Sequence, residues 1–161
     1  MATKTTKKKG ETTTTVSVGI RIDPKIKFAL DLMGRLQKRS LTAVIEWAIS
    51  NAIAQQIAGP FDRPMSEIVD DIWSTDEAAR FVNLCYNLPE ALTYDELRVW
   101  ETIKASALLW KSKGSGNWGT TKDNIDLWMV QMNWESIQLH VEKHKTMSTI
   151  LPMTENDIIP F

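Results

Sequence analysis

Strict alternation of apolar and polar residues occurs in a single segment of the chain, between Thr15 and Pro24. The apolar members are Val16, Val18, Ile20 and Ile22, and the intervening positions hold Ser17, Gly19 and Arg21. A period of two places every second side chain on the same face of the backbone. The pattern therefore predicts a half-buried β-strand.

This strand has no second alternating segment to pair with. A lone strand leaves its N–H and C=O groups without partners, so we expect it to pair with the same strand of a second molecule. The chain would then be an obligate homodimer joined by an antiparallel ribbon. Its dimer core would consist of Val16, Val18, Ile20 and Ile22, with Ser17, Gly19 and Arg21 facing outward. A ribbon of this size fits the major groove of double-stranded DNA.

Two amphipathic helices are predicted directly after the strand. Asp23 is a suitable N-cap for the first helix, and Pro24 occupies its first position, where a missing N–H has no cost. Apolar residues then recur at three- and four-residue spacing over residues 26–36. Ser40 is the predicted N-cap of a second helix with the same periodicity, which ends before Gly59.

In the order and spacing of these elements, residues 15–57 resemble the ribbon-helix-helix family of DNA-binding proteins, of the Arc and MetJ type. The junction Arg39-Ser40-Leu41 between the helices adds to the likeness. In that family the outward strand side chains contact base edges, and the start of the second helix holds a DNA phosphate. The resemblance implies base contacts by Ser17, Gly19 and Arg21, and phosphate contacts by Lys38, Arg39, Ser40, Leu41 and Thr42. The phosphate role has a physical basis, because free N–H groups and the positive dipole end lie at a helix N-terminus.

Gly19 departs from what base recognition needs, because it occupies the central outward position and has no side chain. Direct readout would then depend on Arg21 and Ser17. A bidentate contact from Arg21 to guanine contributes about 1–3 kcal/mol of discrimination, whereas a serine hydroxyl is permissive. We therefore expect modest specificity per dimer. The alternatives are a β-bulge at Gly19 and an ordinary solvated arginine at position 21.

Charge is distributed unevenly along the 161 residues, although the net charge is only −1. Residues 1–58 contain ten Lys or Arg against four Asp or Glu, giving +6, and residues 59–161 contain nine against sixteen, giving −7. The N-terminal part is therefore suited to polyanions. Residues 1–14 are predicted to form a flexible basic arm that contacts phosphates through Lys7, Lys8 and Lys9. The alternative is a solubilising tail.

Composition favours a soluble, cytoplasmic protein without a membrane partner. The hydrophobic content of 43% is ordinary, and no apolar run approaches the ~18 residues of a membrane span. The N-terminus shows no secretory signal. A single cysteine, Cys85, excludes an intramolecular disulfide framework and fits a reducing compartment.

The C-terminal part is predicted to be an all-α domain over residues 66–161, after a Gly- and Pro-containing linker at residues 59–65. Four helices are expected here. The first covers residues 66–73, the second runs from the capping box Ser74-Thr75-Asp76-Glu77 to Asn87, and the third runs from a capping box that starts at Thr93 to about Trp110. The fourth covers residues 122–145. Six of the seven tryptophans lie here, at 73, 100, 110, 118, 128 and 134. They could form a helical core or a partner surface.

Candidate chemistry in this part is weak. The G-x-G-x-x-G match at residues 114–119 follows a helix rather than a strand, so we interpret it as a flexible connection. His140 and His144 lie four apart but are too few to hold a metal. Cys85 lies among apolar residues, where a thiol is usually inert. We expect no enzyme, no cofactor and no metal.

The sequence thus predicts a mainly α fold with an N-terminal ribbon-helix-helix module over residues 15–58. The expected function is that of a dimeric, sequence-specific DNA-binding protein, a transcriptional repressor or autoregulator that forms higher oligomers on DNA. The main alternative is an antitoxin, or an accessory protein in plasmid DNA processing, whose C-terminal domain binds a protein partner. A third possibility is a phage or plasmid inhibitor whose ribbon serves only for dimerisation.

Overall fold

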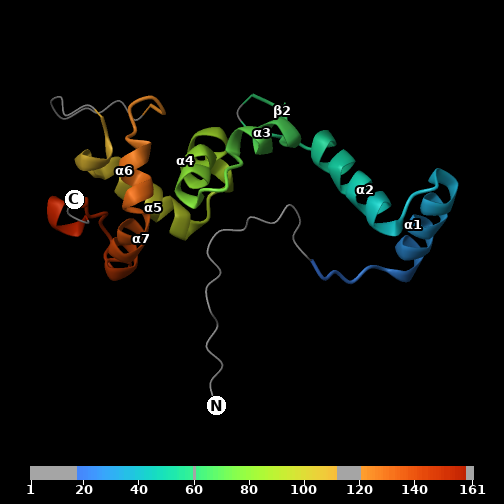
Figure 1. The fold of residues 1–161 in the computed structure, drawn as a ribbon. Coiled ribbons are helices and arrows are strands. Elements are labelled where there is room, and N and C mark those ends of the chain that lie inside the picture. The colour runs from blue at the N-terminus through green and yellow to red at the C-terminus, as the bar shows by residue number, and fades with distance from the viewer. Residues whose placement is uncertain (1–17, 60, 112–120, 159–161) are drawn as a thin grey trace, which may run out of the picture. The chain divides into compact units, whose positions relative to one another are not determined.

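The structure, a computed structural model, describes residues 18–59, 61–111 and 121–158 (Figure 1). Over these residues the chain is mainly helical, with one small two-stranded antiparallel sheet. This agrees with the predicted mainly α fold class. Two compact units are present: the first runs to residue 57 and includes residues 64–67, and the second comprises residues 58–63 and continues from residue 68. An intermolecular ribbon needs two copies, so it stays a prediction, as does the predicted division into arm, module, linker and helical domain.

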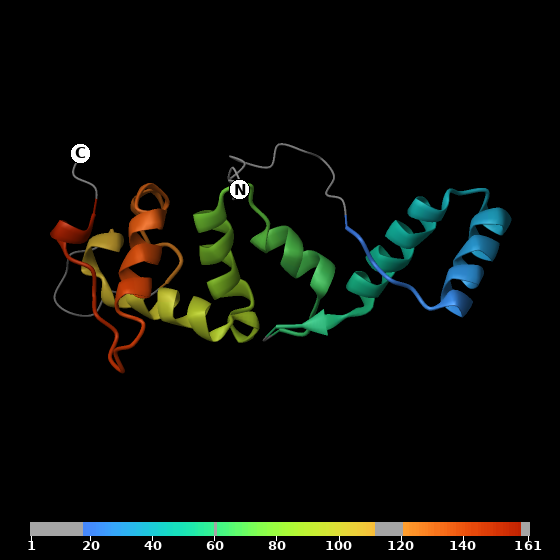
Figure 2. The same ribbon diagram turned by 90° about the horizontal axis from the view of Figure 1, so that it is seen from below.

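The first unit contains helices α1 (Pro24–Gln37) and α2 (Leu41–Gln55), which pack against each other (Figure 2). The Asp23 carboxylate accepts hydrogen bonds from the N–H groups of Lys25 and Ile26, at 2.8 and 3.3 Å. The Ser40 hydroxyl accepts one from the N–H of Ala43 at 3.2 Å. Each cap satisfies N–H groups that the first turn leaves unpaired. Both predicted helix starts are confirmed.

A tight turn joins α1 to α2 and depends on Gly34. Lys38 adopts the left-handed conformation, with φ of 53°, and the N–H of Arg39 donates to the carbonyl of Gly34 at 2.9 Å. This closes the C-terminus of α1. A Cβ on Gly34 would lie 3.0 Å from the carbonyl oxygen of Arg39. Glycine therefore permits the close approach of the turn to the helix.

A small β-hairpin follows α2, with strands β1 (Ile57–Ala58) and β2 (Arg63–Pro64). Gly59 and Asp62 both have positive φ, at 75° and 49°. The N–H of Asp62 donates to the carbonyl of Gly59 at 3.3 Å and closes the turn. Gly59, which helped to predict the end of the second helix, thus lies where the chain reverses.

Five more helices follow in the described residues, where the sequence predicted four. They are α3 (Met65–Ile72), α4 (Glu77–Asn87), α5 (Tyr94–Ala105), α6 (Leu127–Met132) and α7 (Trp134–Lys143), with short 3-10 turns at Pro89–Ala91, Ala107–Leu109 and η3 (Glu155–Asp157). The capping box at Thr93 is confirmed, because the N–H of Thr93 donates to the Glu96 carboxylate and the N–H of Glu96 to the Thr93 hydroxyl, at 2.8 and 3.3 Å.

In the second unit, one predicted helix start and one predicted helix end are wrong. The N-cap of α4 is Asp76 and not Ser74, since the Asp76 carboxylate accepts from the N–H of Ala79 at 2.7 Å. Helix α5 ends at Ala105, well before Trp110. The next residue, Ser106, is fully buried, and its hydroxyl donates to the carbonyl of Thr102 at 2.6 Å.

The predicted long helix over residues 122–145 is also wrong. Residues before Leu127 instead pair with the end of the preceding segment, through a β-bridge between Trp110 and Ile125. The N–H of Asp126 donates to the carbonyl of Leu109 at 2.9 Å, so these residues are held out of a helix. Asn133 then interrupts the helical path between α6 and α7, and its side-chain amide donates to a backbone carbonyl of α6 at 3.0 Å.

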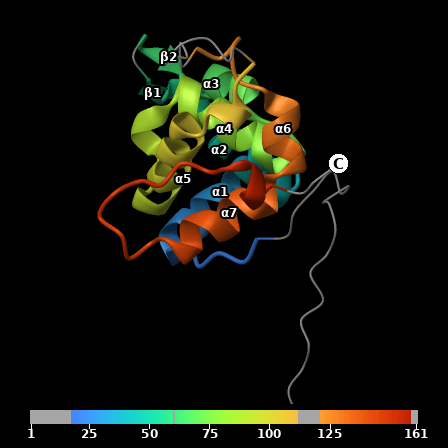
Figure 3. The ribbon, with the colours of Figure 1, turned by 90° about the vertical axis from the view of Figure 1, so that its left-hand side faces the viewer.

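The core of the second unit lies between α4, α5, α6 and α7, with α5 and α7 side by side (Figure 3). Trp100 and Trp110 are buried in it, and Trp134 is partly buried. Trp73 and Trp128 are exposed. The predicted helical core is thus confirmed for Trp100, Trp110 and Trp134, whereas a partner surface stays a prediction, and Trp118 lies outside the described residues. None of the described helices has the length and apolar character needed to cross a membrane.

Candidate nucleic-acid interface

The predicted strand residues have no hydrogen-bonded strand partner within the described part of one chain. Residues 18–23 carry no regular secondary structure. Val18 is 74% exposed and Ile20 is 59% exposed, whereas Ile22 is partly buried. Gly19 and Arg21 are also exposed, so neither face of the segment is covered. Of the predicted strand residues, Val16 and Ser17 lie outside the described ranges.

The helices of the first unit also expose much of their apolar surface. Among the residues of α1 and α2, only Gly34 and Val44 are buried. The exposed large apolar side chains are Ile26, Phe28, Leu32, Leu36, Trp47, Ile49 and Ile53. Soluble monomers rarely expose extended apolar surface unless a partner covers it. The isolated unit is therefore an incomplete hydrophobic core.

The predicted phosphate residues are brought together at the start of α2. Lys38 and Arg39 lie in the turn, Ser40 is the cap, and Leu41 and Thr42 begin the helix. Lys38, Arg39, Ser40 and Thr42 are exposed. The first N–H groups of a helix have no intrahelical acceptor, and the dipole places partial positive charge there. This end of α2 can bind an anion such as a phosphate.

Charge on the first unit favours the same ligand. Described residues 18–57 and 64–67, which belong to this unit, contain six Lys or Arg and four Asp or Glu, giving +2. Lys27 forms an ion pair with Asp31 on α1 at 2.6 Å. The cationic residues of the turn, Lys38 and Arg39, are adjacent to the α2 N-terminus. The predicted arm residues Lys7, Lys8 and Lys9 lie outside the described ranges.

The second unit offers little for catalysis in the described residues. Cys85 is buried, as expected, and burial raises the pKa of its thiol to about 12, so the thiolate is scarce at neutral pH. Burial likewise raises the pKa of Tyr86 to about 12. In the described residues no group of three or more His, Cys, Asp or Glu could hold a metal ion. The G-x-G-x-x-G match at residues 114–119 is not among them.

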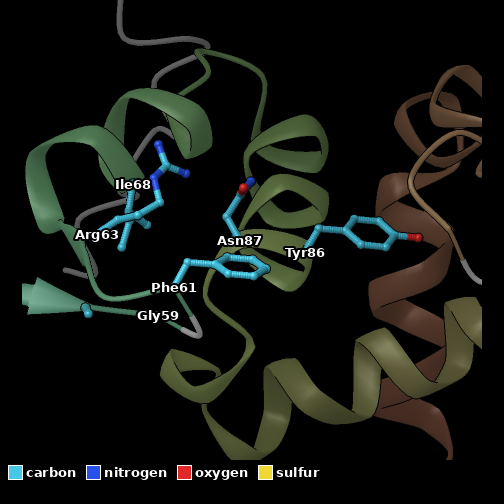
Figure 4. A pocket seen from close by; sticks show the side chains of 7 residues that line it. Gly59, Phe61, Arg63, Ile68, Tyr86 and Asn87 are labelled. Carbon is cyan, nitrogen blue, oxygen red and sulfur yellow. The ribbon is translucent and has the colours of Figure 1, made fainter.

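A small pocket, which the sequence did not predict, lies beside the hairpin in the second unit (Figure 4). Its lining comprises Ala58, Gly59, Phe61, Arg63, Ile68, Tyr86 and Asn87. The Arg63 guanidinium is 2.8 Å from the Asp71 carboxylate, and the Tyr86 ring packs edge-on against Trp100. The Arg63 guanidinium is therefore already paired, and the Asn87 amide likewise donates to the carbonyl of Asn83 at 2.9 Å. The sequence indicated a break in the chain at Gly59 but no pocket.

Comparison with known proteins adds no relative. The chain matches no protein-family model, no curated protein and no solved structure. The resemblance of residues 15–57 to ribbon-helix-helix proteins therefore stays a prediction. The features that favour a nucleic-acid interface are the helix caps, the exposed apolar segment around Val18 and Ile20, and the positive charge of the first unit.

Proposed function

We propose that this protein is a homodimeric, sequence-specific DNA-binding protein that represses transcription. The observation that carries the proposal is the alternating segment around Val18 and Ile20, whose apolar side chains are uncovered within one chain. The same segment of a second copy supplies both the missing backbone partners and part of the missing cover. The resulting ribbon presents Ser17, Gly19 and Arg21 on its outer face.

Helix packing supports the dimer in the same way. Leu36 is 85% exposed and Phe28 is 60% exposed, although both belong to amphipathic helices. Each apolar side chain of this size contributes about 1.5–3 kcal/mol when it is fully buried. Pairing two copies offers these residues the cover that one chain lacks. The dimer is therefore the folded form of the module.

DNA recognition follows from where the polar groups lie. Arg21 on the ribbon reaches base edges in the major groove, and the α2 N-terminus at Ser40 binds a backbone phosphate. Contacts to phosphate fix the register of the protein, while contacts to bases carry specificity. Because Gly19 contributes no side chain, one dimer discriminates weakly. Linking dimers on adjacent sites compensates through multivalency.

A dimer bound over a promoter blocks polymerase without further chemistry. Footprinting of the full chain on the DNA upstream of its own gene tests this function. We expect protected half-sites that persist in excess random DNA. Uniform protection that competitor DNA removes would show non-specific binding, and no protection at low salt would refute the proposal.

A second candidate function keeps the DNA module and gives the second unit a protein partner. The exposed aromatic residues Trp73 and Trp128 favour it, since aromatic side chains are enriched at protein interfaces. An antitoxin or an accessory protein in DNA processing fits this division. Genes next to its own would distinguish the two: a small toxin gene supports the antitoxin, and a relaxase gene the accessory role.

A further inference from the structure

The C-terminal segment of the described chain, residues 150–158, is fastened to the second unit by specific bonds (Figure 3). Met153 is 3% exposed and belongs to the core, and its N–H donates to the buried hydroxyl of Ser106 at 2.8 Å. The N–H and hydroxyl of Thr154 both donate to the Asp157 carboxylate, each at 2.8 Å. The segment thus covers the core and holds Asp157 in a fixed position.

His140 of α7 lies between the helix and this segment. Its ring is buried, with 8% of the residue exposed. Nε2 is 3.1 Å from the carbonyl oxygen of Leu151, and Nδ1 is 3.4 Å from a carboxylate oxygen of Asp157. Both neighbours are acceptors. In the structure Nδ1 makes no hydrogen bond, and its separation from the Asp157 carboxylate is that of an ion pair. A neutral imidazole has a single N–H, whereas the imidazolium has two and carries the charge that such a pair needs.

The other charged or titratable groups near His140 come from α5 and α7. The His144 ring stacks on the His140 ring, with 4.5 Å between centroids, and its Nδ1 is 2.9 Å from the carbonyl oxygen of His140. The Arg98 guanidinium of α5 donates to the carbonyls of His144 and Met147, at 3.1 and 3.3 Å. Asp157 is the carboxylate that faces the ring. It is therefore the counterion of a protonated His140.

We propose that protonation of His140 operates a latch, in which the imidazolium joins the Leu151 carbonyl and the Asp157 carboxylate and fastens residues 150–158 to α7. Loss of the proton removes one of the two contacts and the ionic attraction to Asp157. The latch therefore weakens as the pH rises. This inference does not depend on DNA binding.

Asp157 stays ionised near neutral pH. The N–H and hydroxyl of Thr154 hold the pKa of its carboxyl below the ordinary value of 3.8, with a smaller contribution from His140. The proton that operates the latch is then that of the imidazole. Because Met153 covers the core, release of the segment exposes apolar surface of the second unit as the pH rises.

Amide hydrogen exchange of Met153 in the full chain tests the latch. Its N–H reports attachment directly, because it is bonded to Ser106 only when the segment is docked. After correction for the intrinsic effect of pH, we expect its protection to fall roughly three- to tenfold from pH 5.5 to pH 8, which corresponds to the net contribution of about one ordinary hydrogen bond. Equal protection at both values would overturn the proposal.

Two variants separate the latch from general stability. Asp157→Asn keeps an acceptor for Thr154 but removes the charge, so the pH dependence of Met153 protection should disappear. His144→Gln is the matched control and should keep it. If Asp157→Asn does not fold, nitrogen chemical shifts of the wild-type histidine rings decide. Both His140 nitrogens should carry a proton while Met153 is protected, and one of these protons should be lost at the pH at which the protection of Met153 falls. Separate midpoints, or full pH dependence in Asp157→Asn, would refute the latch.

Discussion

At the scale of single residues, N-cap side chains fix where the two helices of the first unit begin. Asp23 and Ser40 could be predicted from the sequence, because an N-cap bonds an N–H only two or three residues away. Asp76 was missed because Ser74, Thr75 and Asp76 are all suitable acceptors and the sequence does not rank them. The pairing of His140 with Asp157 joins different elements and had no local signal.

Gly34→Ala tests the turn that presents the phosphate residues. Alanine is the better helix former by about 1 kcal/mol, but its Cβ would lie 3.0 Å from the Arg39 carbonyl oxygen, in a turn held by a backbone hydrogen bond. Such crowding typically costs about 1–3 kcal/mol. We expect a net loss of about 1 kcal/mol in the free energy of unfolding, measured by urea denaturation. Ala29→Gly, at an exposed position of α1, is the control for propensity alone. If Gly34→Ala is more stable than the wild type, the turn can move to make room for the added Cβ.

Arg21→Ala tests base recognition. Because the side chain faces outward, we expect operator affinity to fall by about 1–3 kcal/mol while the dimer and the affinity for random DNA change little. Titration of labelled operator and random duplexes measures both. Lys25→Ala, an exposed cation on α1, is the matched control and should not alter the ratio of the two affinities. If Arg21→Ala lowers both affinities equally, Arg21 contacts a phosphate instead.

At the scale of elements, helices with a single apolar stripe and a clear cap were predictable, and those shaped by distant contacts were not. Helices α1, α2, α3 and the end of α4 follow their sequence patterns. The region before α6 has an apolar helical period too, but the bridge between Trp110 and Ile125 prevails over it. Such a bridge depends on a chain reversal that periodicity does not encode. The same limit applies to the small hairpin at Ile57–Pro64.

Ile20→Asp tests the ribbon as an element. Its side chain is predicted to lie in the dimer core, where an unpaired carboxylate costs several kcal/mol. We expect the variant to lose the dimer and the helical structure of the first unit at micromolar concentration, as measured by sedimentation and circular dichroism. Lys25→Asp also changes an exposed residue to aspartate and should leave both intact. A folded monomer of Ile20→Asp would rule out the intermolecular ribbon.

At the scale of the whole molecule, the excess of basic residues and the predicted DNA contacts both lie in the N-terminal part of the sequence. Residues 64–67 group with the first unit, so a chain that ends after Glu67 retains all of it. We expect this truncated chain to bind a single site as tightly as the full chain, but to lose cooperativity on tandem sites. Titration on one-site and two-site duplexes separates these properties. If cooperativity is unchanged, the second unit does not link dimers and has another role. If the truncated chain is a folded dimer that does not bind DNA, part of the DNA interface lies in the second unit.

Cysteine cross-linking between copies tests the central claim, the antiparallel ribbon, most directly. If Gly19 lies at the two-fold axis, position 17 of one copy faces position 21 of the other, within the ~7 Å Cα separation that a disulfide allows. Like positions are then about 13 Å apart, at four residues of ~3.3 Å each. With the buried Cys85 replaced by alanine, Ser17→Cys and Arg21→Cys chains should each stay uncross-linked alone and form a disulfide-linked pair when mixed and refolded together. Cross-linking of either variant with itself, or none in the mixture, would contradict the antiparallel ribbon.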